Sequence, residues 1–208
     1  MRGNVRKSFH SVQWRPPAGL PEGPKIFAAN HHGWHDGYLL YVACTAMNVP
    51  VVDWIAEFDA FPLFAKVGGM PFPPSDPSRR AATVRKTIRL MKDEGRSLML
   101  FAEGILHRPP ELLPFGRSLE VVAAKTGAAV IPTAIRYEIA MHERPEPFLL
   151  FGAPVEPGPK LAERSRLAVR RLLDEGATLI RHDEAVFETL VAGTKDVNER
   201  MKWPGSKR

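Results

Sequence analysis

The chain has 208 residues, a formal net charge of +6 and a single cysteine, Cys44. A chain of this length buries about 70% of its unfolded surface, enough for one hydrophobic core without disulfides or metals. The N-terminus lacks the apolar segment of a signal peptide, and no window holds the roughly 20 apolar residues that cross a bilayer. We expect one domain over residues 1–208, with Cys44 as a buried apolar residue.

Strands and helices alternate along the first half of the chain. The pattern predicts a strand at 25–30, a buried helix at 37–47 and a second strand at 50–55. A segment rich in proline, glycine and aromatic residues follows, which predicts a loop with one helical turn. Its phenylalanines either fill the core or line a groove or membrane surface; they are Phe58, Phe61, Phe64 and Phe72.

The clearest helix covers residues 78–94. Apolar side chains recur at steps of three and four, basic side chains occupy the opposite face, and Gly95 ends the helix. The apolar residues are Ala81, Val84, Ile88 and Met91. Further elements are predicted as a strand at 97–101, a helix at 118–125, strands at 129–137 and 148–152, and a helix at 161–190 interrupted near Gly176.

This alternation predicts an α/β domain, layered, with a largely parallel central sheet flanked by helices. We expect its core over residues 25–155, a helical C-terminal part over 160–192 and a basic tail over 193–208. Chemistry in such sheets gathers where strands end and loops begin. Two polar clusters lie at predicted strand ends, residues 30–36 and residues 103–108.

The first cluster reads NHHGWHDG and has three interpretations. His31 and His35 have the i, i+4 spacing of a zinc pair, although no glutamate follows in the H-E-x-x-H order. The segment can also be a polar turn in which Asn30 or Asp36 caps the next helix. In the third interpretation, His31 and Asp36 form an acid–base pair.

The acid–base pair requires a break in the helix. On a continuous helix His31 and Asp36 lie about 140° apart and cannot meet. They meet if His31 sits in a strand-end loop and Asp36 in the first helical turn, with Gly33 letting the chain fold back. A carboxylate on one imidazole nitrogen leaves the other free to take a proton from a hydroxyl. Spacing alone leaves all three interpretations open.

Four sequence blocks resemble the glycerolipid acyltransferases, the lysophosphatidic-acid acyltransferase superfamily. NHHGWHDG resembles the family's N-H-x4-D block, and FAEG at 101–104 resembles its F-P-E-G block. GGMPF at 68–72 lies where the family has a glycine–aromatic block, and AAVIPTAIR at 128–136 resembles its later strand. The resemblance covers about residues 25–155.

The resemblance implies an O-acyltransferase. His31 would deprotonate an acceptor hydroxyl and Asp36 would orient it, with Glu103 and Gly104 contributing to substrate binding. The donor would be an acyl thioester of coenzyme A or acyl carrier protein, and the acceptor a lysophospholipid such as 1-acylglycerol-3-phosphate; neither a cofactor nor a metal is implied. Backbone N–H groups near Gly33 or Gly104 are candidate oxyanion donors, each contributing about 3 kcal/mol.

The chain departs from the family where the acceptor's phosphate is bound. F-P-E-G is normally followed by Thr-Arg-Ser, but here Ile105, Leu106 and His107 follow, and Ser75 stands near the position of the second block's arginine. A guanidinium a few residues away can substitute, and the candidates are Arg79, Arg80 and Arg108. Otherwise the acceptor is a non-phosphorylated hydroxyl of a lipid, glycolipid or carotenoid type.

Basic residues at 79–96, together with the aromatic segment before them, predict peripheral binding to an anionic membrane. We expect the cytoplasmic, inner face of the cell membrane, with about 1 kcal/mol per Lys or Arg near the surface. Nucleic acid is not expected, because the chain lacks the aromatic–basic interleaving of RNA modules. Alternatives from other classes are a metal-dependent hydrolase using His31, His35 and Asp36, and a non-catalytic binder of anionic lipid or nucleic acid.

Overall fold

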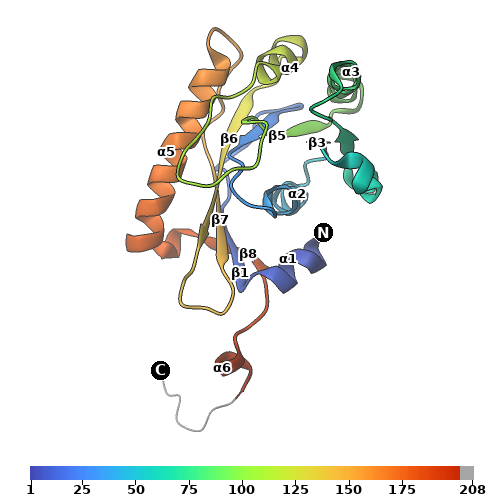
Figure 1. Cartoon of the computed structure of the whole chain (residues 1–208). Coiled ribbons are helices and arrows are strands. Elements are labelled where there is room, and N and C mark those ends of the chain that lie inside the picture. The colour runs from blue at the N-terminus through green and yellow to red at the C-terminus, as the bar shows by residue number, and fades with distance from the viewer. Residues whose placement is uncertain (202–208) are drawn as a thin grey trace.

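An eight-stranded sheet runs through the molecule in the order β4-β3-β5-β2-β6-β7-β1-β8 (Figure 1). The computed structural model describes residues 1–201. The strands are β1 (Ser11–Arg15), β2 (Ile26–Ala29), β3 (Val51–Ile55), β4 (Gly69–Pro71), β5 (Ser97–Phe101), β6 (Val130–Glu138), β7 (Glu146–Phe151) and β8 (Glu188–Ala192). The α-helices are α1 (Arg2–Ser8), α2 (Asp36–Ala46), α3 (Pro77–Glu94), α4 (Ser118–Thr126), α5 (Leu161–His182) and α6 (Val197–Arg200). Short 3-10 helices are η1 (Phe58–Ala60), η2 (Pro62–Val67) and η3 (Glu184–Val186).

The predicted α/β class with a largely parallel sheet is confirmed. β4, β3, β5, β2 and β6 pair in parallel, and β1 is parallel to β7. The β6–β7 and β1–β8 pairs are antiparallel. Because the carboxyl ends of parallel strands share one edge of the sheet, the loops that follow β2, β3 and β5 meet at that edge together with the end of β6.

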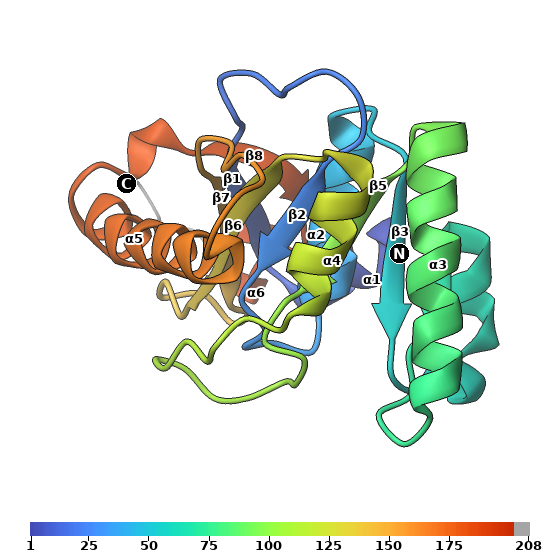
Figure 2. The same cartoon turned by 90° about the horizontal axis from the view of Figure 1, so that it is seen from above.

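Helices cover both faces of the sheet (Figure 2). One apolar core lies between the sheet and α3, α4 and α5, and the other between the sheet and α1 and α2. Successive residues of β2 alternate between the two cores: Ile26 and Ala28 face the first, whereas Phe27 and Ala29 face the second. A strand buried on both faces is apolar throughout, which is why β2 reads as a continuous apolar run.

Helix α3 matches the predicted range, but its buried face is different. Thr83, Thr87 and Met91 are buried, whereas Val84 is half-buried and Ala81 is exposed. The threonine hydroxyls can be buried because they are hydrogen-bonded: Thr83 donates to the Pro71 carbonyl at 2.6 Å, and Thr87 accepts from Trp54 Nε1 at 2.8 Å.

The C-terminal part differs more from the expectation. Helix α5 continues through Gly176, whose backbone packs against Leu150: a Cβ there would lie 3.1 Å from Leu150 Cδ1. The helix ends at His182, and β8 then pairs with β1, so the predicted helical part over 160–192 is wrong for its last residues. The expected tail over 193–208 contains α6, and its residues 202–208 lie outside the described part.

Sequence reasoning also missed α1, β1 and the short edge strand β4. The aromatic segment forms η1, η2 and β4. Phe72 is half-buried and stacks on Trp54, whereas Phe61 is exposed, and its predicted groove or membrane role stays a prediction. Cys44 is buried as expected, and burial raises its pKa. Within residues 1–201, none of the helices has the length and apolar character needed to cross a membrane.

Candidate active site

His31 and Asp36 meet where β2 ends and α2 begins. His31 lies in the loop after β2, and Asp36 is the first residue of α2. His31 Nδ1 lies 2.9 Å from Asp36 Oδ2, and the Asp36 side chain is fully buried. Because Nδ1–H donates to the carboxylate, Nε2 carries the free lone pair. This geometry matches the acid–base interpretation of the first cluster.

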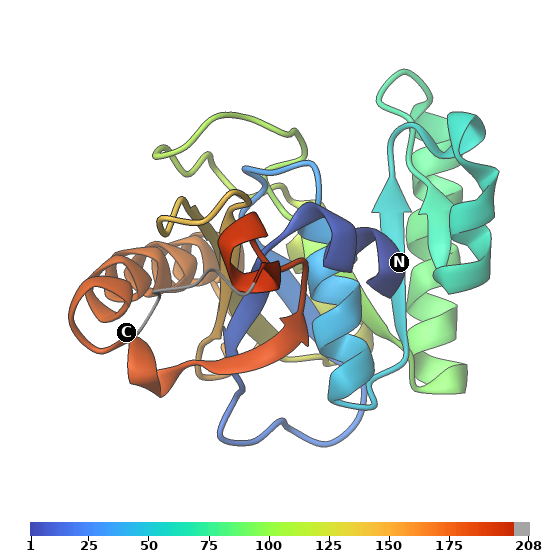
Figure 3. The ribbon, with the colours of Figure 1, turned by 90° about the horizontal axis from the view of Figure 1, so that it is seen from below.

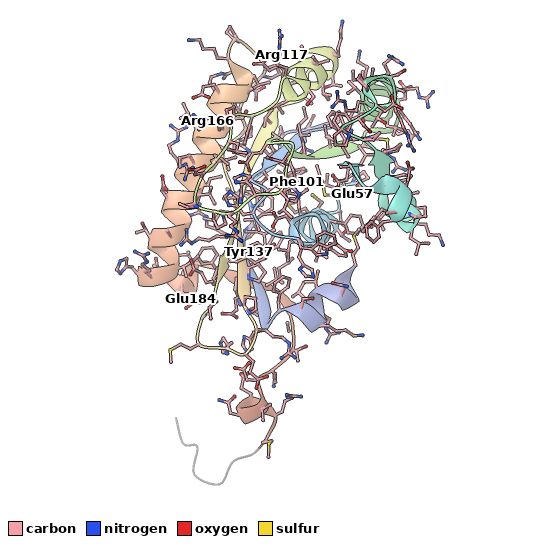
Figure 4. The ribbon with its side chains drawn as sticks, in the orientation of Figure 1. Glu57, Phe101, Arg117, Tyr137, Arg166 and Glu184 are labelled. Carbon is pink, nitrogen blue, oxygen red and sulfur yellow. The ribbon has the colours of Figure 1, made fainter. Side chains whose placement is uncertain are left out.

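The buried Asp36 carboxylate has two further donors. The Gly33 backbone N–H donates to Oδ2 at 2.9 Å, and the Tyr137 hydroxyl donates to Oδ1 at 2.5 Å. Burial, followed by the charge and hydrogen bond of Asp36, raises the pKa of Tyr137, so the phenol stays a donor. Tyr137 lies on β6, next to β2, and sequence reasoning missed its role (Figure 4).

Gly33 is needed for steric reasons. A Cβ at this position would lie 2.4 Å from ring atoms of Tyr137. Gly33 does not have a positive φ, so the backbone freedom that we predicted is not the reason for a glycine here. The reason is close packing against Tyr137, the tyrosine that donates to Asp36.

Glu103 fixes the backbone of His31. Its carboxylate is fully buried, and Oε1 accepts the His31 N–H at 2.8 Å, while Oε2 accepts the Leu113 N–H at 2.6 Å and faces His107 Nε2 at 2.6 Å. The His107 N–H in turn donates to the His31 carbonyl at 3.1 Å. These contacts give Glu103 a role in positioning the His31 backbone, and its predicted contact with substrate stays a prediction.

The Phe101 ring packs on the His31 imidazole, with centroids 4.4 Å apart and planes at 28° (Figure 4). Phe101 ends β5, on the side of β2 opposite Tyr137. Phe101 against one face and the Asp36 carboxylate at Nδ1 together fix the orientation of the His31 ring. In this orientation Nε2 points away from Asp36.

The other histidines of the cluster have different partners. His35 Nε2 faces Ser8 Oγ and Asn4 Oδ1, both at 3.1 Å, so His35 packs against α1 and forms no zinc pair with His31. His32 Nε2 donates to the Glu111 carbonyl at 2.8 Å. Burial lowers the pKa of both residues, so both imidazoles are neutral near pH 7.

The N–H groups of Gly33 and Gly104 themselves both have hydrogen-bond acceptors within the protein. The Gly104 N–H donates to the Phe101 carbonyl at 3.0 Å, in a turn where Gly104 has a φ of 77° that favours glycine. The Gly33 N–H is bonded to Asp36. Both N–H groups therefore have acceptors within the protein, and the expectation of an oxyanion donor among the N–H groups near Gly33 or Gly104 stays a prediction.

The predicted phosphate-binding arginines lie in different settings. Arg79 forms a bidentate pair with Asp59, at 2.6 and 2.7 Å, near the start of α3. Arg80 lies over the Phe72 ring, 5.9 Å from its centroid, and Arg108 is exposed in the loop after β5. Arg80 and Arg108 keep donors available for an anion, whereas Arg79 is already paired with a carboxylate.

Asp53 is a third carboxylate near the dyad. Its Oδ1 is buried and has no hydrogen-bond partner among residues 1–201. A Cβ on Gly37 would lie 3.6 Å from Oδ2, so the carboxyl faces the first turn of α2. Burial raises the pKa of Asp53 to about 7, opposed by a backbone hydrogen bond at Trp54 and by the charge of His31.

The sequence of residues 11–136 matches the Acyltransferase family. This region is more than half of the chain and contains His31, Asp36 and Glu103. The chain therefore belongs to the acyltransferase family, within the glycerolipid acyltransferase superfamily.

Two curated relatives are the chloroplastic 1-acyl-sn-glycerol-3-phosphate acyltransferases LPAT1 of Arabidopsis thaliana and BAT2 of Brassica napus. Each is 26% identical over 138 residues, which cover 61% of this chain. The match spans only 36% and 38% of those proteins. A solved structure, the 1-acyl-sn-glycerophosphate acyltransferase PlsC of Thermotoga maritima, shares the fold with a TM-score of 0.61 at 20% identity, over 82% of this chain and 73% of that one.

Replacing Tyr137 by Phe tests the support of Asp36. The variant removes one hydrogen bond to a buried carboxylate, so we expect the acyl-transfer kcat to fall about 10-fold with little change in KM. Steady-state kinetics measure both values, and Tyr41→Phe, a half-buried tyrosine on α2, is the matched control. Equal kcat values for Tyr137→Phe and the control would contradict the assignment.

Asp53→Asn tests the raised pKa of the buried Asp53 carboxyl through the pH dependence of stability. The raised pKa means that folded protein keeps the Asp53 proton up to about pH 7, whereas the unfolded chain loses it near pH 4. Wild-type stability, relative to the variant, should therefore fall between pH 4 and pH 7, by at most about 4 kcal/mol. Urea denaturation at several pH values measures the difference, and parallel pH curves would refute it.

Proposed function

We propose that this chain transfers a fatty acyl group from an acyl thioester to the hydroxyl of a lysophospholipid such as 1-acylglycerol-3-phosphate. The donor is acyl-CoA or acyl carrier protein, and His31 with Asp36 is the general base. The observation that carries the proposal is the 2.9 Å contact between His31 Nδ1 and Asp36 Oδ2 in a member of the acyltransferase family. It fixes the tautomer in which Nε2 can accept a proton.

The reaction follows from this tautomer. His31 Nε2 takes the proton of the acceptor hydroxyl as its oxygen attacks the thioester carbonyl carbon. The new C–O bond gives a tetrahedral oxyanion, which collapses with cleavage of the C–S bond. The leaving thiolate takes the proton from the His31 imidazolium, so the base is regenerated. Asp36 stabilises the imidazolium because its charge lies against Nδ1–H.

The relatives support a phosphorylated acceptor, since LPAT1 and BAT2 are 1-acyl-sn-glycerol-3-phosphate acyltransferases and PlsC is a 1-acyl-sn-glycerophosphate acyltransferase. Arg80 and Arg108 are our candidates for phosphate contacts, with Arg79 as a weaker candidate because it is paired with Asp59. One observation favours a second acceptor class. Ile105 and Leu106 are exposed apolar residues directly after Gly104, where the resemblance expects a threonine and an arginine. They suit a lipid-like alcohol without a phosphate.

We also propose that the enzyme works at an anionic membrane surface, at the cytoplasmic face of the cell membrane. Exposed apolar side chains come from three loops at the edge of the sheet that carries the dyad: Trp34 after β2, Phe61 and Leu63 after β3, and Ile105 and Leu106 after β5. Since β3, β5 and β2 are adjacent parallel strands, the loops that carry these side chains lie at the same edge of the sheet as the loop with His31. Trp34 and Leu63, exposed to 67% and 73%, are the most exposed of these five.

His31→Ala tests the chemistry. We expect kcat to fall about 10³-fold with acyl-CoA and 1-acylglycerol-3-phosphate, because the general base is removed. His182→Ala, an exposed histidine at the end of α5, is the control and should retain full activity. Monoacylglycerol, which lacks the phosphate, tests the acceptor in the same assay. Undiminished transfer by His31→Ala would refute the dyad, and a higher kcat/KM for monoacylglycerol would replace the phosphorylated acceptor by the neutral one.

Vesicle flotation tests the membrane surface. The double variant Trp34→Ser, Leu63→Ser should bind vesicles of phosphatidylglycerol and phosphatidylcholine at least about 10-fold more weakly, since it removes two exposed apolar side chains from the dyad's edge. Leu167→Ser, on the exposed face of α5, is the matched control. Equal binding by both variants would place the membrane contact elsewhere on the molecule.

A further inference from the structure

Two histidines and two carboxylates converge away from the dyad, between the segment before β1, the β6–β7 loop and the start of α6. His10 follows α1, His142 lies in the loop between β6 and β7, and Asp196 and Glu199 belong to the start of α6. One nitrogen or oxygen atom from each of these four residues lies within 4.8 Å of the others. Figure 3 views the molecule from below, with both α1 and α6 on the near side of the sheet.

The contacts within this cluster pair each histidine with a carboxylate. His10 Nε2 lies 2.9 Å from Glu199 Oε2, and His142 Nδ1 lies 2.7 Å from Asp196 Oδ2. The two imidazoles are stacked, with centroids 3.4 Å apart and planes at 8°. Three segments, each more than 50 residues from the next along the chain, thus present two nitrogen and two oxygen ligand atoms to one small volume.

The surrounding groups hold these donors in place. His10 Nδ1 lies 3.0 Å from Glu146 Oε1, and Glu146 is buried and also accepts a hydrogen bond from Ser11. Asp196 Oδ1 accepts the Glu143 N–H at 3.0 Å, which leaves Oδ2 toward His142. In protein metal sites a ligating histidine almost always gives its second ring nitrogen to a carboxylate or carbonyl, and ligating carboxylates are themselves hydrogen-bonded.

Charge also favours a cation here. Three carboxylates, of Glu146, Asp196 and Glu199, surround the two imidazoles. Within residues 1–201, no lysine or arginine nitrogen lies in ion-pair distance of any of the three. An open hollow of about 370 Å³ adjoins the cluster at Asp196; it is lined by Met141, Glu143, Asp196, Val197, Asn198 and Met201.

We propose that His10, His142, Asp196 and Glu199 form a binding site for a divalent transition metal, and for Zn²⁺ first. Two imidazole nitrogens with two carboxylate oxygens are a tetrahedral ligand set of the kind zinc accepts, whereas Mg²⁺ and Ca²⁺ prefer all-oxygen sites. The metal ties α6 and the β6–β7 loop to the segment before β1. That segment includes Phe9, which packs on Tyr137 and His35, so the site supports the elements around the dyad without taking part in the reaction.

The test measures zinc on the untagged, full-length protein. After treatment with EDTA and dialysis, isothermal titration with ZnCl₂ should give one zinc per chain. Thermal unfolding should show a Tm rise of about 5 °C or more at 100-fold excess of zinc over its Kd, reversed by EDTA. His142→Ala should weaken binding at least about 10-fold, while His182→Ala, at an exposed site on α5, should bind as the wild type does.

Glu199→Gln is a second, independent variant. The Glu199 side chain is more exposed than that of His142, so this substitution disturbs the fold less, and it should also weaken zinc binding. Absence of stoichiometric binding, or equal affinities in wild type and both variants, would overturn the proposal. Binding that survives His142→Ala but is lost in His107→Ala would place the zinc beside Glu103 and would overturn it equally.

Discussion

A buried carboxylate, that of Asp36, organises the structure around it. An ionised carboxylate in a protein interior is strongly destabilising unless donors surround it. Here two of the three donors, His31 and the Gly33 backbone N–H, lie in the loop after β2, and the third, the Tyr137 hydroxyl, lies on β6. Satisfying this one charge therefore fixes the loop between β2 and α2 against the neighbouring strand, and it orients the imidazole at the same time.

Glu103 is a second buried carboxylate that contacts His31, at its backbone instead of its ring. Its buried carboxylate accepts hydrogen bonds from the backbones of His31 and Leu113, and His107 closes the contact. One carboxylate thus controls the His31 ring and the other controls its backbone. The long loop after β5 is held by the second carboxylate, and Arg166 and Arg170 of α5 bond its Leu112 and Pro110 carbonyls. The hydrogen bonds of Glu103 therefore both position His31 and hold the loop after β5.

Local pattern predicted much of the fold. Apolar runs gave β2, β3 and β5, and the 3.6-residue period with a terminal glycine gave α3 within one residue of its start. The errors lie where tertiary contacts decide. Gly176 reads as a helix interruption, yet it is kept helical by close packing on Leu150, and β8 is a strand because β1 offers it an edge. Thr83 and Thr87 are buried through hydrogen bonds that the hydrophobic period does not include.

Of the candidate site, the part predictable from the sequence was the pair that lies close together in the chain. His31 and Asp36 are five residues apart, so spacing and a strand end suffice to suggest the pair. Tyr137 is 101 positions from Asp36, and nothing in its local sequence indicates that its hydroxyl reaches that carboxylate. The same holds for the cluster of His10, His142 and Asp196, whose members come from both ends of the chain and one hairpin loop. The glycine N–H groups give a related example: Gly33 and Gly104 are visible in the sequence, but the acceptors of their N–H groups are not.

The central claim is that Asp36 holds His31 in the tautomer with the proton on Nδ1 and the lone pair on Nε2. Nitrogen-15 NMR of the histidine side chains, at a pH where His31 is neutral, tests this most directly. The account predicts that the His31 Nδ1 resonance is that of a protonated ring nitrogen and Nε2 that of an unprotonated one, and that Asp36→Asn disturbs this preference. A His31 ring with its proton on Nε2 in the wild-type protein would contradict the account.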